Sequence, residues 1–291
     1  MIPGILAAVL AFTPADASLS YATASNLVAN CTPRDAGTFR GRRAANFLLD
    51  RVSAETGADV RRDIFEADTP KGRRTFTNLL AEFRADASDE WIVVVSHYDT
   101  KCGTGCPGAN DGASTSGLLA GLAQALRRAG VPPVNVVLLW TDGEECMRGY
   151  TDRDGFWGSR HAAEEFRREG RKLRAVICLD MLGDRDLAIS LPKNTSPELR
   201  AVALAAAGRI GGADRVKEVS ELVKDDHVAF QTLLGVPSVD LIDFAYGGSP
   251  GSNEWWHTPS DTVDKISVES LDFSGRLVVE MLSALYARAA E

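Results

Sequence analysis

The chain lacks the paired cysteines from which a thiolate zinc site is built. Its 291 residues include five cysteines, and among these only Cys102 and Cys106 lie close together. A zinc site made of thiolates needs a second such pair, so that kind of site is not indicated. Cys102 and Cys106 are near enough to bridge a surface loop in an oxidising compartment, whereas Cys31, Cys146 and Cys178 have no obvious partner. We interpret the cysteines as structural.

Clustered basic charge and long apolar runs are also missing. The chain has 32 basic and 40 acidic residues, a net charge of -8, and no Lys or Arg cluster forms a stripe. Such a stripe would be needed to bind a phosphate backbone, so a nucleic-acid partner is not expected. No segment beyond the amino terminus approaches the length of a transmembrane helix, and we expect no stable membrane insertion.

The amino terminus has the pattern of a secretory signal. A short apolar run over residues 2–12 is followed by Ala15-Asp16-Ala17, which is typical of a small-residue cleavage site. No Lys or Arg precedes the run, so the usual positive segment is absent, and a cytosolic protein with an unstructured start is the alternative. We predict a signal peptide over residues 1–17, a secreted or periplasmic location, and a single domain over residues 18–291.

Helix and strand patterns alternate along that domain. Helical spacing occurs over residues 37–56, 114–129, 159–169, 197–207, 226–234 and 268–289, and strand patterns occur over 75–83, 91–96, 134–140, 175–179 and 238–242. Strands rich in Val, Ile and Leu on both faces, separated by helices, indicate a mostly parallel sheet covered on both sides. No repeat or long linker divides the chain, so the sequence predicts one α/β domain.

Polar side chains of the kind that bind metals stand where the predicted strands end. His97 and Asp99 follow one strand, Glu144-Glu145 follow another, and Asp180 ends a third. Ligands of such sheets bind at the carboxyl ends of the strands. Each motif alone has an ordinary explanation, since His97 and Asp99 can form a hydrogen-bonded pair and two adjacent Glu can form a solvated turn.

Two loops add further candidates. Asp111 and Asp225 precede helices and can act as caps, and His257 beside Trp255 and Trp256 can belong to an aromatic cluster. Taken together with the strand ends, however, these imidazoles and carboxylates suit zinc. The candidate ligands His97, Asp111, Glu145, Asp180 and His257 exceed the needs of one site. They indicate either a two-metal site or one metal with hydrogen-bonded neighbours, and leave Glu144 as a proton carrier.

These residues resemble the motif set of the M28 zinc peptidases. The resemblance rests on His97-Tyr98-Asp99, Gly108-Ala109-Asn110-Asp111, Glu144-Glu145, Asp180 and His257-Thr258-Pro259-Ser260-Asp261, and it extends from about Gly37 to the carboxyl terminus. It implies an M28-like catalytic domain with three α/β/α layers and a mixed, mostly parallel sheet. It also implies that Asp111, Glu145 and His257 hold one zinc ion, and that His97 and Asp180, with Asp111 as the bridge, hold a second.

Within this superfamily, the loop after the paired Glu resembles that of the animal-type glutaminyl-peptide cyclotransferases, or glutaminyl cyclases. Residues 146–157 intervene before Gly158-Ser159-Arg160-His161, where aminopeptidases have a shorter turn. The stretches at residues 74–78, 225–227 and 256–257 are similar to the cyclases as well. Residues 107–114 and 257–267 are similar to the peptidases instead, and Tyr150 stands where the cyclases have tryptophan.

The cyclase resemblance implies conversion of an N-terminal glutamine of a peptide or protein to pyroglutamate, an intramolecular acyl transfer that releases ammonia. One Zn²⁺, held by Asp111, Glu145 and His257, suffices. Glu144 is implied as the group that takes a proton from the amine and returns it to the departing nitrogen. Asp180 and Asp225 are implied as a hydrogen-bonded pair that steers Glu144, while Trp256, Tyr150 and Val223 wall the substrate pocket.

Two alternatives use the same fold. A zinc aminopeptidase would bind a second metal at His97 and Asp180 and use Glu144 as the base for a hydroxide. A metal-free binding module is less favoured, because every ligand position is filled. We favour the cyclase because the long loop and its Gly158-Ser159-Arg160-His161 ending are harder to obtain by chance than variants in glycine-rich turns.

Overall fold

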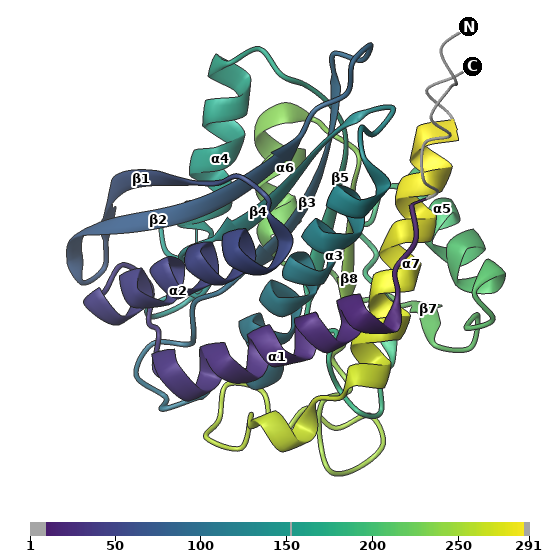
Figure 1. Cartoon of the computed structure of the whole chain (residues 1–291). Coiled ribbons are helices and arrows are strands. Elements are labelled where there is room, and N and C mark those ends of the chain that lie inside the picture. Colours follow the sequence, from purple (N-terminus) through teal and green to yellow (C-terminus); the bar gives the residue numbers. More distant parts are fainter. Residues whose placement is uncertain (1–9, 152, 288–291) are drawn as a thin grey trace, which may run out of the picture.

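An eight-stranded mixed sheet forms the centre of the protein (Figure 1). The computed structural model describes residues 10–151 and 153–287. The strand order is β1-β2-β4-β3-β5-β8-β6-β7, with β4, β3, β5 and β8 parallel to one another. The strands are β1 (Val60–Thr69), β2 (Gly72–Phe83), β3 (Glu90–His97), β4 (Asn135–Thr141), β5 (Lys172–Asp180), β6 (Ile189–Leu191), β7 (Val216–Glu218) and β8 (Ser238–Ile242).

Helices cover both faces of this sheet. The helices are α1 (Pro14–Cys31), α2 (Phe39–Thr56), α3 (Thr115–Ala129), α4 (Trp157–Arg168), α5 (Pro197–Arg209), α6 (Asp226–Leu234) and α7 (Val268–Ala287), with single turns at η1 (Ala109–Ser114) and η2 (Val263–Lys265). Helices α4 and α6 pack on one face, and the other helices pack on the opposite face and its edge. The predicted three-layer α/β fold is confirmed.

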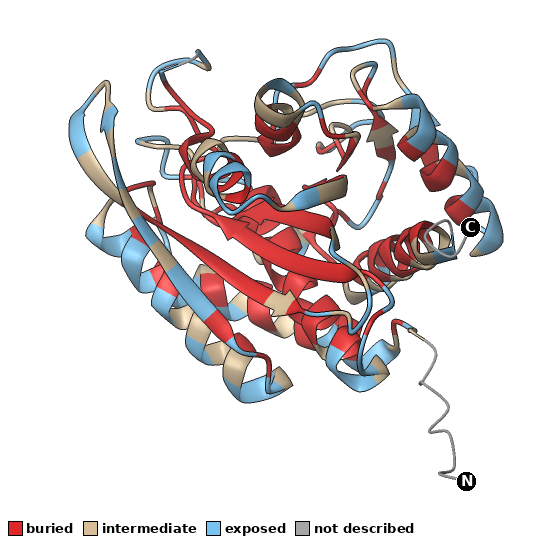
Figure 2. Ribbon diagram, turned by 90° about the horizontal axis from the view of Figure 1, so that it is seen from above, coloured by how far each residue is buried: buried red, intermediate tan, exposed pale blue. Residues whose placement is uncertain are grey.

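The central strands are buried because their side chains alternate between two apolar cores. In β3, Ile92 and Val94 join the core under α1, α2, α3 and α7, whereas Val93 and Val95 join the core under α4 and α6. Figure 2 shows these strands as a continuous buried band. A strand with apolar side chains on both faces is stable only when other elements cover both faces. This requirement fixes the layered architecture.

Elements with weak apolar patterns were not predicted from the sequence. Strand β1 forms an antiparallel hairpin with β2 at the edge of the sheet, and most of its side chains are exposed or half-buried. Strands β6 and β7 are only three residues long. The predicted closing helix extends to Ala287 in the structure, and its last predicted residues, 288–289, lie outside the described residues.

Helix α1 occupies part of the segment predicted as a signal peptide. Thr13 and Asp16 form a capping box, in which the Asp16 carboxylate accepts hydrogen bonds from the Thr13 backbone N–H at 2.8 Å and from its hydroxyl at 2.7 Å. Asp16 is fully buried and also pairs with Arg128 of α3 at 2.7 Å. The predicted cleavage site therefore lies within a packed helix.

Small residues let α1 approach α3 closely. A methyl group added at Gly117 would lie 2.3 Å from the Ser20 carbonyl oxygen, and one added at Gly121 would lie 2.3 Å from the Ser20 hydroxyl. Residues 1–9 of the predicted signal peptide lie outside the described residues, and processing and secretion stay predictions. Within the described ranges, no helix has the length and apolarity that crossing a membrane requires.

Replacing Asp16 by Ala should lower the free energy of unfolding by about 2–3 kcal/mol, because both the helix cap and the partner of Arg128 are lost. Chemical denaturation of the purified protein measures this change. The control is Ser18→Ala in the same helix, where the exposed hydroxyl donates only to the Pro14 carbonyl; it should change stability by less than about 0.5 kcal/mol. Equal stability of the Asp16 variant and the parent protein would show that α1 is not anchored as described.

Candidate metal centre

The carboxyl ends of the parallel strands open into a cavity of about 420 Å³. Its lining comprises Asp111, Glu144, Glu145, Tyr150, Asp180, Ser190, Val219, Glu221, Leu222, Val223, Lys224, Asp225, Ile242, Phe244, Trp256 and His257. Strands β4, β5 and β8 contribute through the residues at or just after their ends, as expected for an open α/β sheet. All three residues predicted to wall a substrate pocket, Tyr150, Val223 and Trp256, are in this lining.

Three predicted ligands converge at one side of the cavity. His257 Nε2 lies 2.8 Å from Glu145 Oε1 and 3.3 Å from Asp111 Oδ2. Both oxygens are buried and have no hydrogen-bond partner among the described residues. Ligand atoms about 2.0–2.2 Å from a tetrahedral zinc ion lie about 3.3 Å from one another. Two carboxylates and one imidazole at this spacing would suit a zinc ion, because catalytic zinc sites use three protein ligands.

A second group of ligand atoms shares Asp111. His97 Nε2 lies 3.2 Å from Asp111 Oδ1 and 3.2 Å from Asp180 Oδ1. His97 is the last residue of β3 and Asp180 the last of β5, so the parallel pairing of these strands brings the two side chains together. The spacing permits a second cation bridged by Asp111. The geometry of the ligands alone therefore allows either one or two metal ions.

Burial and mutual repulsion control the charges of these groups. Burial opposes ionisation of Asp111, but the rings of His257 and His97, whose Nε2 atoms lie 3.3 Å and 3.2 Å from its oxygens, lower the pKa of its carboxyl below the ordinary value. Burial likewise opposes protonation of His257, yet the contacts with Asp111 and Glu145 raise the pKa of its ring to about 9. The carboxylates thus stabilise positive charge at this position, which is the property that a cation site needs.

The loop that carries Asp111 is held by Asp261. Its carboxylate accepts hydrogen bonds from the backbone N–H groups of Asn110 at 2.8 Å and of Asp111 at 3.1 Å, and from the Tyr246 hydroxyl at 2.6 Å. Gly112 follows with a φ of 88°, and a methyl group there would lie 2.9 Å from the Asp99 carbonyl oxygen. Asp261 belongs to the loop after His257, so one carboxylate links the two loops that supply ligands.

Asp99 fixes the paired glutamates in the same way. One of its carboxylate oxygens accepts the backbone N–H groups of Gly143 at 3.0 Å and Glu144 at 3.2 Å, and the other accepts that of Glu145 at 3.2 Å. The first oxygen also lies 3.5 Å from His97 Nδ1. Asp99 is fully buried, so it orients groups from both clusters without entering the cavity.

Glu145 and Glu144 are distinguished by their neighbours. The Oε2 atom of Glu145 accepts hydrogen bonds from Lys101 Nζ at 3.1 Å and from the Tyr150 hydroxyl at 2.8 Å, which leaves Oε1 to face His257. Glu144 lies beside it, with Oε2 3.2 Å from the Tyr150 hydroxyl. Burial, followed by the charge of Glu145, raises the pKa of the Glu144 carboxyl well above its usual range.

The long loop after the glutamates closes one wall of the cavity. Asp154 accepts hydrogen bonds from the backbone N–H groups of Met147 and Gly149, and Phe156 N–H donates to the Glu144 carbonyl. Tyr150 stacks on Phe156 with ring centroids 5.0 Å apart. The lining also includes Trp256, which stacks on His257 with ring centroids 3.8 Å apart.

Asp180 and Asp225 both reach the cavity, but no hydrogen bond joins their side chains among the described residues. Asp225 caps α6, and its carboxylate accepts the Asp226 backbone N–H. Burial, followed by the charge of Asp180, raises the pKa of the Asp225 carboxyl well above its usual value. The two groups are electrostatically coupled, and the expected direct pairing stays a prediction.

The supporting roles of several residues were not predicted from the sequence. Asp99 and Asp261 belong to the motifs noted above, but their bonds to backbone amides were not predicted, and the contact of Lys101 with Glu145 was not predicted either. The Gly158-Ser159-Arg160-His161 motif lies outside the cavity lining, and its His161 pairs with Asp63 at 3.2 Å. All five cysteines are free, Cys102 and Cys106 included.

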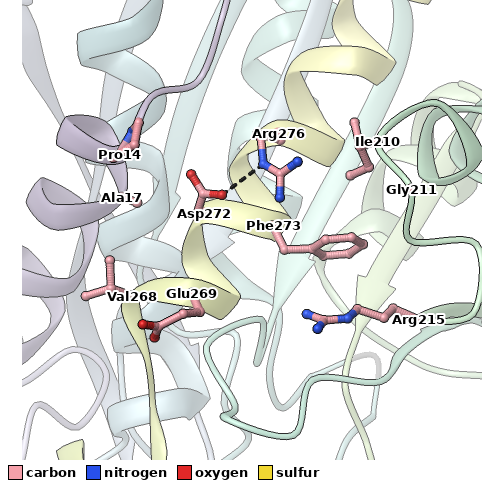
Figure 3. A pocket seen from close by; sticks show the side chains of 10 residues that line it. All are labelled: Pro14, Ala17, Ile210, Gly211, Arg215, Val268, Glu269, Asp272, Phe273 and Arg276. Carbon is pink, nitrogen blue, oxygen red and sulfur yellow. Dashed lines mark hydrogen bonds and ion pairs between the residues drawn. The ribbon is translucent and has the colours of Figure 1, made fainter.

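A separate cavity of about 450 Å³ lies between α1, α7 and the end of α5 (Figure 3). Its Arg276 side chain pairs with Asp272 at 2.8 Å, and Arg215 lies over the Phe273 ring at 5.1 Å. None of the clusters of metal-ligating atoms found in the described part of the chain borders it. The carboxylate-lined cavity is therefore the candidate functional site.

Fold and site together define a class of protein, the α/β/α metalloenzymes with imidazole and carboxylate ligands at the carboxyl ends of a mixed sheet. A sequence model described as peptidase family M28 matches residues 78–282. The chain belongs to this family, which confirms the predicted resemblance. It is accordingly an enzyme, either a cyclotransferase or a related metallopeptidase.

The relatives include several glutaminyl cyclases. The glutaminyl-peptide cyclotransferase of Drosophila melanogaster is 28% identical over 269 residues, which cover 82% of this chain and 73% of that protein. Among solved structures, an Acidobacteriales bacterium glutaminyl cyclase is 30% identical, with a TM-score of 0.87 and 99% of both chains covered. The Porphyromonas gingivalis glutaminyl cyclase is 26% identical, with a TM-score of 0.82, covering 92% of this chain and 98% of the other.

Replacing Asp99 by Asn should weaken zinc binding by about 10–100-fold. The Asp99 carboxylate accepts hydrogen bonds from backbone N–H groups, whereas the NH₂ end of an amide would face those donors without accepting from them. Competition with a chelator of known affinity measures this change. The matched control is Asp243→Asn, since Asp243 is equally buried and accepts the backbone N–H groups of Ala188 and Ala245 away from the ligands. If both variants bind zinc as tightly as the parent protein does, Asp99 does not organise the ligands.

Proposed function

We propose that this protein is a zinc-dependent glutaminyl-peptide cyclotransferase that converts the N-terminal glutamine of peptides to pyroglutamate and releases ammonia. The observation that carries the proposal is the convergence of Asp111, Glu145 and His257 beside Glu144 in a cavity whose walls include Tyr150 and Trp256. The similarity to glutaminyl cyclases over nearly the whole chain supports the same activity.

The donor set supports one zinc ion at Asp111, Glu145 and His257. When bound there, zinc supplies a Lewis acid that polarises the γ-carbonyl of the substrate glutamine. The orphaned oxygens of Asp111 and Glu145 are costly in a buried site unless a cation compensates them. A metal-free binding module would leave that cost unexplained.

The reaction requires one proton to be moved within the site. The α-amine of the substrate forms a bond to the γ-carbonyl carbon, and the bond from this carbon to the side-chain nitrogen breaks. Glu144 accepts the proton that the amine loses and delivers it to the departing nitrogen, so ammonia leaves and no water is consumed. Glu144 is well placed for this role because it is buried, borders the cavity and is not one of the three proposed ligands.

The walls suit a single glutaminyl side chain. Trp256, Tyr150 and Val223 flank the carboxylates, and Phe244 meets the Trp256 ring edge-on at 5.8 Å. Several acidic groups surround the position where the positively charged amino terminus of a peptide would lie. We propose that Asp180 and Asp225 steer Glu144 and the departing ammonia from the inner side of the cavity.

A zinc aminopeptidase is the second candidate. It is favoured by the cluster of His97, Asp111 and Asp180, whose spacing permits another metal ion. Two metals would activate a water molecule for peptide hydrolysis, with Glu144 as its base. The two activities share every ligand and differ in their products.

Mass spectrometry of a Gln-initiated peptide incubated with the zinc-loaded enzyme should show loss of ammonia with the peptide chain intact. The same peptide with an acetylated amino terminus should stay unchanged, because its nitrogen is no longer nucleophilic. Chelation should abolish turnover, and added zinc should restore it. Release of a free amino acid would instead identify an aminopeptidase.

Two substitutions should separate metal binding from proton transfer. Glu144→Gln should retain zinc and reduce kcat by about 10²–10⁴-fold, because an amide cannot accept the proton. Asp111→Ala should lose zinc, because one of three ligands is removed. Metal analysis beside the activity assay distinguishes the two variants. An active Glu144→Gln enzyme would remove Glu144 from the proton-carrying role, and full zinc content in Asp111→Ala would remove Asp111 from the ligand set.

A further inference from the structure

The hydroxyl group of Tyr150 contacts the side chains of both glutamates at the cavity wall. Its oxygen lies 2.8 Å from Glu145 Oε2 and 3.2 Å from Glu144 Oε2. A phenol has one hydrogen, so it cannot donate fully to two carboxylates at once. The other partners of each carboxylate decide which glutamate depends on this hydroxyl.

The two glutamates differ in how many groups hold their side chains. Lys101 Nζ donates to Glu145 Oε2 at 3.1 Å, and His257 Nε2 lies 2.8 Å from Glu145 Oε1. Glu144 is buried, and in the described part of the chain the Tyr150 hydroxyl is the only hydrogen-bond donor to its carboxylate. A buried carboxylate needs such a partner to hold one orientation. The Glu144 side chain is therefore the one that depends on Tyr150.

The Tyr150 ring is held in place by packing on several sides. It stacks on Phe156 with ring centroids 5.0 Å apart, and Lys101 Nζ lies 4.6 Å from its centroid. Gly155 has a φ of 94°, and a methyl group there would lie 3.0 Å from Tyr150 Cδ1. The backbone thus approaches the ring as closely as a residue without a side chain allows. A ring fixed in this way places its hydroxyl at a defined position.

The loop that carries Tyr150 is also tied to the backbone of Glu144. Asp154 accepts the backbone N–H groups of Met147 at 2.7 Å and of Gly149 at 3.0 Å, which closes the loop on itself. The backbone N–H of Phe156 donates to the Glu144 carbonyl oxygen at 3.0 Å. The Glu144 backbone and the ring that contacts its side chain therefore belong to one hydrogen-bonded unit.

We propose that Tyr150 is a positioning residue for Glu144, because its hydroxyl fixes the orientation of this carboxylate at the cavity wall. A hydroxyl can donate to an ionised carboxylate and accept from a protonated one. The contact can therefore persist while a carboxylate takes up a proton and gives it back. Lys101 supplies a donor to Glu145, which leaves the hydroxyl available to Glu144.

The consequence for the reaction rests on the proposed function, in which Glu144 moves a proton from the substrate amine to the departing nitrogen. Proton transfer needs hydrogen-bonding distance, and an error of about 1 Å in position can cost about 10²-fold in rate. Without the hydroxyl, the Glu144 side chain can rotate away from that position. The hydroxyl of Tyr150 thus acts on the chemical step through Glu144, whereas its ring borders the cavity.

Removing the hydroxyl in Tyr150→Phe should lower kcat of the zinc-loaded enzyme by about 10–100-fold. KM should change by less than about threefold, because phenylalanine keeps the ring that packs on Phe156 and borders the cavity. A Tyr150→Phe enzyme with the kcat of the parent would overturn the proposal.

The matched control is Tyr286→Phe, which removes the same group from α7. The Tyr286 hydroxyl is buried and has no hydrogen-bond partner among the described residues. This variant should keep kcat within about twofold of the parent enzyme. If Tyr286→Phe lowers kcat as much as Tyr150→Phe does, the loss is not specific to the contact with Glu144 and the proposal fails.

A double variant shows whether Tyr150 acts through Glu144. In Glu144→Gln the proton carrier is already lost, so adding Tyr150→Phe should lower kcat by less than about a further threefold. If the two substitutions instead lower kcat by the product of their separate effects, the hydroxyl acts independently of Glu144, and the positioning role is refuted.

Metal analysis separates this role from an effect on the proposed ligand Glu145. The zinc content of Tyr150→Phe should equal that of the parent enzyme, because Lys101 still donates to Glu145 Oε2. A loss of zinc from Tyr150→Phe would overturn the proposal in favour of a role in metal binding.

A crystal structure of Tyr150→Phe makes the outcome independent of the reaction. It should show the phenylalanine ring in the place of the Tyr150 ring, with the Glu144 side chain displaced. An unmoved Glu144 side chain refutes the positioning role, whichever product the enzyme makes. If the parent enzyme releases amino acids instead of ammonia, the proposed cyclase function fails, and the same kcat comparison is made on peptide hydrolysis.

Discussion

The structure depends on the cost of burying many carboxylates together. Asp111, Glu144, Glu145, Asp180 and Asp225 border one cavity and are shielded from solvent, where like charges repel strongly and lose their hydration. The compensating charges are His97, His257 and Lys101, together with the cation that the first two can help to bind.

Backbone amides and a buried guanidinium fix the positions of the loops that carry these groups. Asp99 and Asp261 each accept several backbone N–H groups, so the loops are set by carboxylates rather than by regular strands. Arg34 is fully buried and donates to the carbonyl oxygens of Tyr98, Pro107 and Gly108, before the Asp111 loop. Rigid support of this kind keeps ligand atoms at the spacing that a metal ion requires.

Cyclisation and hydrolysis differ little in the groups that they require. As proposed, both would use Asp111, Glu145 and His257 as ligands, and both would use a carboxylate that moves a proton. The second cluster would offer the extra site that hydrolysis needs, whereas Tyr150 of the long loop lies beside Glu144 in the cavity lining. The hydroxyl of Tyr150 also lies 2.8 Å from Glu145 Oε2 and 3.2 Å from Glu144 Oε2, so it is within hydrogen-bonding distance of both glutamates.

The sequence by itself determined the layered α/β fold and the candidate ligands, because apolar runs such as that of β3 need two covered faces and because parallel strands end at one edge. The charged edge strand β1 and the helix α1 carry no comparable pattern, and their places were set by pairing with β2 and packing on α3. Only the tertiary structure decided which oxygen of Glu145 faces His257, and that Asp99 and Asp261 anchor the ligand loops. Those contacts join residues far apart in the chain, and local patterns of polarity do not specify distances between side chains.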